Sequence, residues 1–322
     1  MDETRKLIAR RMFRLRVHEA KGTEFQHLFE QVMQYRYPGF KAIKPHGNVG
    51  DRKNDGYIAS LGRYFQVYAP EEPHTNDSAV AAARKAAKDF AGLVAYWQKI
   101  AAVKEYRFVF NDEYRGTPPP LEEALAAIQK DHGISASVML TKELEDEAMK
   151  LDPDQLADVI NSSIPETSLF DSVDFGVLRE VVQHVLRQAD PVTIDDFLEA
   201  PDFDQKIQFN GLSKGVAVLL TYGSYQSDAV DDYFSKNSTF ARQQVRDHLS
   251  STYSLCRTRI SNAASPLADA GDLVFFRILD TIVPRVPAAS REQSARVQQA
   301  AIVVMAYYFE ACDIFESPDV AT

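Results

Sequence analysis

The sequence has little cysteine and no long hydrophobic run. Its two cysteines, Cys256 and Cys312, lie far apart and have no second cysteine or histidine at a metal-binding spacing, so neither a disulfide framework nor a zinc site is supported. The longest apolar run, near residues 300–309, ends at Glu310 and is about half as long as a bilayer-spanning helix. No apolar signal segment follows the N-terminus. We therefore expect a cytoplasmic protein without a membrane-spanning segment.

Several sequence motifs of enzymes are also missing. No GxGxxG or GxxxxGK[ST] pattern occurs, so a nucleotide-hydrolysing site has no support. No arrangement typical of a hydrolase serine nucleophile stands out either. Hydrophobic residues make up 45% of the chain and charged residues 25%, which is typical of a globular protein. A chain of 322 residues is expected to form two domains, each with its own core.

The first 150 residues have no net negative charge, because most of the basic residues lie there. Residues 1–150 contain 23 basic and 21 acidic side chains, whereas the rest contains 13 and 25, and the whole chain has a net charge of −10. Binding to a phosphate backbone requires lysine and arginine, and Arg10, Arg14 and Arg16 lie on the first expected helix. These arginines are candidate DNA-binding residues; a solvated charged face is the alternative.

The hydrophobic pattern predicts an α/β domain followed by an all-α domain. Helices are expected to about residue 20 and at 23–35, and the proline and serines of residues 161–165 predict a linker. We therefore predict domains at residues 1–160 and 170–322. Strands are expected at 40–44, 55–60, 63–69, 106–110 and 135–140, with helices beginning at Asp77 or Ser78 and at Leu121. In the first of these helices, the apolar repeat Ala83, Ala87, Phe90, Val94 and Trp97 is expected to pack on the sheet.

Oxygen-bearing side chains fall on three of these elements. Glu24 lies on the second helix, Asp55 begins the second strand and Gln66 lies in the third. The second and third strands form a hairpin, which places neighbouring backbones about 4.8 Å apart. Carboxylate and amide oxygens suit Mg²⁺, which can activate water and neutralise charge on a phosphodiester. The pattern thus predicts a metal site.

The αβββαβ order with Glu24, Asp55 and the run Gln66-Val67-Tyr68 resembles the PD-(D/E)xK restriction-endonuclease-like superfamily in its Mrr-like form. The resemblance implies a mixed sheet flanked by helices and a DNA endonuclease that uses Mg²⁺ (or Mn²⁺) on double-stranded DNA. Metal ligands would be Glu24, Asp55 and Gln66, joined by Asp51.

One residue departs from that pattern. The family's final motif ends in a lysine, where this chain has Tyr68, a neutral side chain that cannot act as a cation. Lys53, two residues before Asp55, could supply the charge from the same strand face. Alternatively Tyr68 could donate a hydrogen bond to a phosphate oxygen or to water. Asn54-Asp55-Gly56 is also an ordinary turn sequence, and this interpretation stays open.

Two segments of the second half resemble the helical C-terminal domain of ABC-three component systems, which are bacterial antiphage defence loci. They are Lys206 to Ser213 and Tyr307 to Glu316. The resemblance implies association with a small middle component and an ABC-type ATPase. A helical dimerisation domain is the alternative, which leaves homo-oligomerisation open. The functional hypothesis is a metal-dependent endonuclease effector; the alternative is a catalytically inactive nuclease-like module that binds DNA or the partner ATPase as an adaptor.

Overall fold

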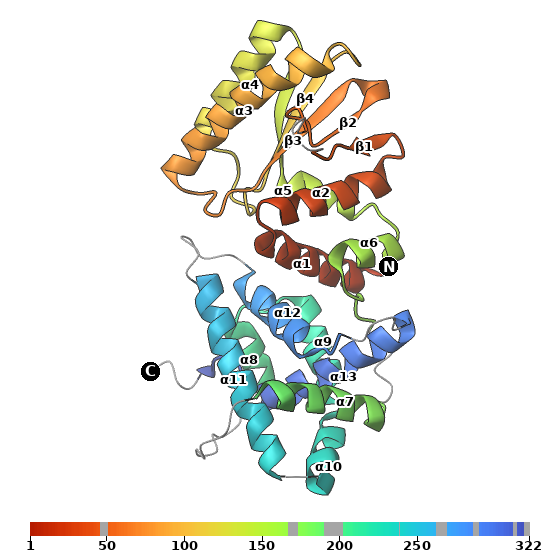
Figure 1. Ribbon diagram of the computed structural model, residues 1–322. Helices are drawn as coiled ribbons and strands as arrows, with labels where there is room; N and C mark the ends of the chain where they lie inside the picture. Colours follow the sequence, from red (N-terminus) through yellow and green to blue (C-terminus); the bar gives the residue numbers. More distant parts are fainter. Residues whose placement is uncertain are drawn as a thin grey trace. The chain divides into compact units, whose positions relative to one another are not determined.

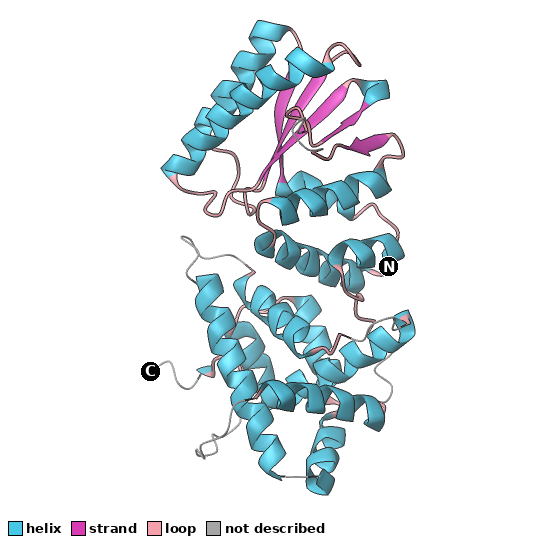
Figure 2. Ribbon diagram, in the orientation of Figure 1, coloured by secondary structure: helices cyan, strands magenta, loops and turns pink. Residues whose placement is uncertain are grey.

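Five strands form one mixed sheet in the N-terminal half of the chain, and helices make up the rest (Figures 1 and 2). The computed structural model describes residues 1–45, 51–166, 173–189, 202–237, 239–261, 269–285, 290–311 and 314–318. The strands are β1 (Phe40–Ala42), β2 (Gly56–Ile58), β3 (Arg63–Tyr68), β4 (Glu105–Phe110) and β5 (Ser135–Leu140). They lie in the order β1-β2-β3-β4-β5, with antiparallel pairing from β1 to β3 and parallel pairing from β3 to β5.

Six helices precede, separate or follow the strands in the N-terminal half of the chain. They are α1 (Glu3–Glu19), α2 (Thr23–Arg36), α3 (Asn76–Trp97), α4 (Pro119–His132), α5 (Thr141–Ala148) and α6 (Pro153–Ile160). A 3-10 turn, Ala59–Leu61, and the left-handed Gly62 join β2 to β3. The predicted α/β class of the first part and the helical class of the second are confirmed. The restriction-endonuclease fold itself remains a prediction.

The two faces of the sheet carry different helices. Phe65 in β3 packs on Phe29 of α2, with ring centroids 5.3 Å apart, whereas its neighbour Tyr64 packs on Trp97 of α3 at 6.1 Å. Side chains alternate across a strand, so α2 covers the face of Phe65 and α3 covers the face of Tyr64. Helix α4 joins α3 there through Leu121 and its apolar neighbours, and Figure 1 shows α3 and α4 side by side.

Helix α3 is rotated relative to the predicted packing face. Thr75 caps it by accepting a hydrogen bond from the Ser78 amide at 3.2 Å, so the helix begins before the expected Asp77 or Ser78. The buried positions of α3 are Ala82, Ala86, Asp89, Phe90, Leu93 and Trp97. Ala82 and Ala86 thus replace the predicted Ala83 and Ala87, because the two aromatic residues at the C-terminal end fix the rotation of the helix on the sheet.

The chain divides into two compact units. Residues 16–161 form one, which we call the α/β unit, and residues 1–15 with 162–322 form the other, the helical unit. The predicted domains place residues 1–15 with the sheet, but in the structure Arg11 forms an ion pair of 2.9 Å with the buried Asp272. Gly215 lies against Ile8, so close that a Cβ there would be 3.2 Å from the Ile8 side chain.

In the helical unit, α13 (Arg291–Glu310) is buried over most of its length. Its neighbours are α7 (Phe175–Gln188), α8 (Phe203–Phe209), α9 (Lys214–Ser224), α10 (Ser227–Asn237), α11 (Thr239–Ser261) and α12 (Ala270–Ile282). Helix α9 approaches α13 closely at Gly223, where a Cβ would lie 2.8 Å from Ala306 and 3.0 Å from the Ile302 carbonyl oxygen. Glycine therefore sets this helix contact.

Among the described residues, no helix combines the length and the apolar character needed to span a membrane. Cys256 is a buried free thiol, and Cys312 lies outside the described residues.

Candidate active site

The β2–β3 hairpin brings Asp55 and Gln66 together. Tyr57 pairs with Tyr64 and Gly56 with Phe65, so the same register places Asp55 opposite Gln66. The Gln66 side-chain amide donates a hydrogen bond of 2.7 Å to Asp55 Oδ2, and the Val67 backbone N–H donates another of 2.6 Å to the same oxygen. The structure thus joins two of the predicted metal ligands in one hydrogen-bonded pair.

Burial makes this pair electrostatically unusual. Both Asp55 and Gln66 are 4% exposed. Burial raises the pKa of Asp55 from 3.8 to about 7, although the hydrogen bond from Val67 opposes that shift. Gln66 Oε1 is buried without a hydrogen-bond partner among the described residues. A buried acceptor without a partner is costly, so the pair lacks a positive or hydrogen-bonding group at this point.

Helix α3 carries charged groups near the pair, in addition to Asp51 and Glu30, which both raise the pKa of Asp55. Gln66 lies on the same strand face as Tyr64, which is the face that α3 covers. On α3, Asp89 is 2% exposed and accepts two ion pairs, one from Lys85 at 2.5 Å and one from Lys53 at 3.1 Å. Lys85 also lowers the pKa of Asp55 electrostatically. Two lysines held by Asp89 therefore interact electrostatically with Asp55.

Lys53 reaches α3 from a strained turn. Arg52 and Lys53 have φ values of 55° and 63°, a left-handed conformation that costs a non-glycine residue about 1 kcal/mol or more. Asp51 Oδ1 accepts a hydrogen bond of 2.8 Å from the Lys53 amide and holds the turn. The Lys53 side chain then crosses α3 at Gly92, where a Cβ would lie 3.0 Å from Lys53 Cγ. The hydrogen bond to Asp89 raises the pKa of Lys53.

Tyr68 packs as an aromatic residue beside a cation. Its ring lies 6.0 Å from that of Phe108 and 6.2 Å from that of Phe110, so most of its contacts are apolar. Lys85 Nζ lies 5.7 Å from the Tyr68 ring centroid. The positive charge that the sequence lacks at position 68 is therefore present beside it, on α3.

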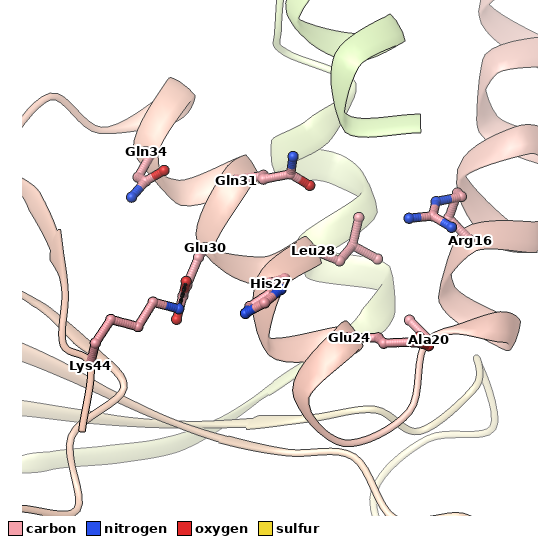
Figure 3. Close-up of a pocket in the computed structure, with 9 residues that line it drawn as sticks. All are labelled: Arg16, Ala20, Glu24, His27, Leu28, Glu30, Gln31, Gln34 and Lys44. Atoms are coloured by element: carbon pink, nitrogen blue, oxygen red, sulfur yellow. Dashed lines mark hydrogen bonds and ion pairs between the residues drawn. The ribbon is translucent and has the colours of Figure 1, made fainter. Parts of the chain in front are cut away.

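Glu24 is not brought to this site. It is exposed on α2, which covers the opposite face of the sheet from Gln66. There it lines a polar pocket of about 470 Å³. Figure 3 shows Glu24 toward the end where Arg16 is drawn, while Lys44 meets Glu30 at the other end. The buried carboxylate of α2 is Glu30, which also accepts a hydrogen bond of 2.9 Å from Gln26.

The arginines of α1 do not form one exposed basic face. Arg14 belongs to the helical unit and forms an ion pair of 2.9 Å with Asp269 of that unit. Arg10 is partly buried in the same unit. Arg16 belongs to the α/β unit, lines the pocket of Glu24 and lies 4.0 Å from Glu19. The three side chains are thus divided between two units.

Sequence reasoning missed Lys85 and Asp89. Their only local signal is an i, i+4 Lys–Asp pair on a predicted helix, which is usually a solvated surface pair. The burial of Asp89 depends on the rotation of α3 against β3, which the apolar repeat placed differently. Lys53, by contrast, was named from the sequence, and in the structure it pairs with Asp89; its part in catalysis remains a prediction.

A metal ion would have few carboxylate ligands here. Among the residues that the structure describes, no three histidine, cysteine, aspartate or glutamate side chains could together hold one. Asp55 and the unpartnered Gln66 Oε1 nevertheless fit Mg²⁺, which prefers oxygen ligands and commonly keeps several waters while binding one or two protein carboxylates. A cation at this pair would satisfy the orphaned amide oxygen and favour ionised Asp55.

In the helical unit, the two segments singled out in the sequence contact each other. The Asn210 side chain donates a hydrogen bond of 2.8 Å to the Glu316 carbonyl oxygen and accepts one of 3.0 Å from the Glu316 amide. Lys206, which is 1% exposed, donates a hydrogen bond of 2.7 Å to the Phe309 carbonyl oxygen. The C-terminal part of α8 therefore contacts the end of α13 and the segment that follows it.

These contacts lie within a segment that matches a known protein family. Residues 177–316 match C-terminal domain 10 of the ABC-three component (ABC-3C) systems. This segment of the helical unit is therefore similar to an ABC-3C C-terminal domain, in agreement with the resemblance seen in the sequence. No curated protein and no solved structure matches the chain, and the α/β unit lies outside the matched residues.

Proposed function

We propose that this protein is the endonuclease effector of an ABC-3C antiphage system, with a Mg²⁺-dependent active site at Asp55 and Gln66. The observation that carries the proposal is the buried pair itself. Asp55 provides a buried carboxylate, and Gln66 provides an amide oxygen that has no hydrogen-bond partner among the described residues. On the same side of the sheet, two lysines pair with one buried aspartate, Asp89. The ABC-3C domain at residues 177–316 supports the defence context.

Each side chain has a role in phosphodiester hydrolysis. Asp55 and Gln66 would hold the metal ion, which, when bound, activates water and neutralises charge on the phosphate. Lys85 takes the place of the family's lysine, because its ammonium lies beside Tyr68 and can stabilise negative charge at the scissile phosphate. Asp89 holds Lys85 and Lys53 in position. Tyr68 fills the apolar space under Lys85.

The helical unit would bind the other components of the system. Its ABC-3C domain favours association with a small middle component and an ABC-type ATPase. An acidic surface is consistent with protein partners, since the chain beyond residue 150 contains 25 acidic and 13 basic side chains, a balance that repels DNA.

The alternative is a module that binds DNA or the ATPase without cleaving. One observation favours it: Tyr68, at the position of the family's lysine, packs on Phe108 and Phe110. In that case Lys85 would only neutralise Asp89.

Cleavage of plasmid DNA by the full-length protein, alone and with the partner ATPase, tests the proposal. We expect nicking or degradation with Mg²⁺ or Mn²⁺ and none in EDTA. Asp55→Ala should abolish cleavage, whereas Glu24→Ala, which removes an exposed carboxylate on the opposite sheet face, should leave it intact. Metal-dependent cleavage that persists in Asp55→Ala would show that the site is elsewhere. Absence of cleavage under all conditions, with DNA binding retained, would favour the binding module.

A further inference from the structure

Two lysines of α3 and two basic residues of the loop before β2 lie along one side of α3. Lys85, Lys88, Gly92 and Tyr96 follow one another at spacings of three and four residues, which places them along the same side of a helix. The loop before β2 contacts this side of α3 near the glycine and the tyrosine. Lys53 crosses α3 at Gly92, and the Arg52 guanidinium lies 5.2 Å from the Tyr96 ring centroid. We call Arg52, Lys53, Lys85 and Lys88 the α3 strip.

The α3 strip has a local excess of positive charge. After its first turn, α3 contains a single acidic residue, Asp89, and this carboxylate is buried and paired with two of the four cations. Arg52, Lys53 and Lys88 are exposed. Asp51 and Asp55 also interact electrostatically with Lys53, so the four cations of the strip outnumber the three carboxylates near them, although the whole chain is acidic.

The strip has dimensions that suit a nucleic-acid backbone. Lys85 and Tyr96 are eleven residues apart, which corresponds to about 16 Å along a helix axis. That length equals the rise of about five base pairs of duplex DNA. The row starts at Lys85, beside Asp55 and Gln66, so a strand bound along it would lead directly to the proposed active site.

The backbone conformation of the loop before β2 directs its basic side chains toward α3. Two consecutive non-glycine residues, Arg52 and Lys53, adopt positive φ, and such strain persists where the surroundings impose it, commonly at functional sites. The strained turn presents both side chains to α3. Tyr96 is 40% exposed, so its ring is also open to solvent beside the arginine.

We infer that the α3 strip is the surface that binds the sugar-phosphate backbone of double-stranded DNA. Arg52 and Lys88 contact phosphates outside the reacting centre, while Lys53 and Lys85 connect the strip to Asp89 and the Asp55–Gln66 pair. This inference rests on the proposed function for its choice of partner, and it assigns DNA binding to α3 and its covering loop in place of the α1 arginines.

The test is equilibrium DNA binding by the full-length protein without metal. Fluorescence anisotropy of a labelled random-sequence duplex is measured in EDTA from 50 to 200 mM salt for wild type and for Arg52→Gln with Lys88→Gln. Each lost phosphate contact should reduce the slope of log K against log salt by about 0.9, so the double variant should bind more weakly with a slope reduced by about 2. The matched control is Lys104→Gln with Lys130→Gln, which removes two exposed lysines of the same unit outside the strip.

The outcomes separate the inference from the proposed function. Unchanged affinity and slope in Arg52→Gln with Lys88→Gln would overturn the inference, and so would an equal loss in the control variant or no DNA binding by wild type. Cleavage that still depends on Asp55 would show that the proposed function survives such a failure. Conversely, strip-dependent binding without any cleavage would support the inference and contradict the nuclease.

Discussion

Gln66 donates a hydrogen bond of 2.7 Å to the carboxylate of Asp55 and leaves its own amide oxygen without a partner among the described residues. The pair is buried on the sheet face that α3 covers. Burial raises the pKa of Asp55 to about 7, so near neutral pH this carboxylate is poised between its neutral and its charged form. A bound cation would favour the charged form.

Acidification should therefore stabilise wild type relative to Asp55→Asn. The folded protein holds a proton on Asp55 up to about pH 7, whereas the unfolded chain releases it near 3.8. Between these values the unfolded state binds fewer protons, so the free energy of unfolding falls as pH rises. The advantage of Asp55→Asn should grow by about 1 kcal/mol per pH unit from pH 4 to 7 and then level off. Urea unfolding without metal at several pH values measures this; a pH-independent difference would contradict a buried, proton-holding Asp55.

Lys85→Met should lower cleavage by about 100-fold, the usual cost of removing one electrostatic contact to a transition state. Tyr68→Phe keeps the ring contacts with Phe108 and Phe110 and should cleave like wild type. Single-turnover rates on duplex DNA measure both. The opposite order, with a harmful Tyr68→Phe and a neutral Lys85→Met, would mean that the tyrosine hydroxyl acts in place of the lysine.

Gly92→Ala should preserve the stability of the protein but slow its cleavage of DNA. Alanine in the interior of a helix is favoured over glycine by about 1 kcal/mol, and the atom that the new Cβ meets belongs to the flexible Lys53 side chain. The variant should thus be at least as stable as wild type, yet cleave more slowly because Lys53 is displaced from Asp89. Thermal unfolding and cleavage rates test this. If Lys53→Met and Gly92→Ala act through the same contact, their double variant should be no slower than Lys53→Met alone.

The Asp55–Gln66 pair could be predicted because a hairpin joins neighbouring strands in sequence, and strand alternation fixes which side chains share a face. Glu24 could not be excluded in the same way. Alternation shows that Gln66 and Phe65 point to opposite faces, but not which helix covers each. That depends on packing between Phe29 and Phe65 on one side and between Tyr64 and Trp97 on the other.

Lys85 and Asp89 were missed for a related reason. The face that α3 buries differs by about one residue from the face that its apolar repeat predicts. This difference is enough to place Asp89 in the core and not on the expected surface. In the helical unit, the segments that include Asn210 and Glu316 were found in the sequence, but their contact, across 106 positions, is a product of tertiary packing.

Arg11→Ala should destabilise the helical unit by about 3 kcal/mol, because it leaves the buried Asp272 without its ion-pair partner. Lys6→Ala, an exposed change on the same helix, should stay within about 0.5 kcal/mol of wild type. Chemical denaturation of the full-length chain compares the two. Equal, small effects would show that α1 does not stabilise this unit through Asp272.

Binding of Mn²⁺ to the full-length protein, followed by electron paramagnetic resonance, tests the central claim most directly. The account predicts that wild type and Glu24→Ala bind an ion equally well, and that Asp55→Asn and Gln66→Ala each lose most of that affinity. Absence of a bound ion in wild type, or an ion bound equally well by Asp55→Asn, would contradict a metal site at the Asp55–Gln66 pair.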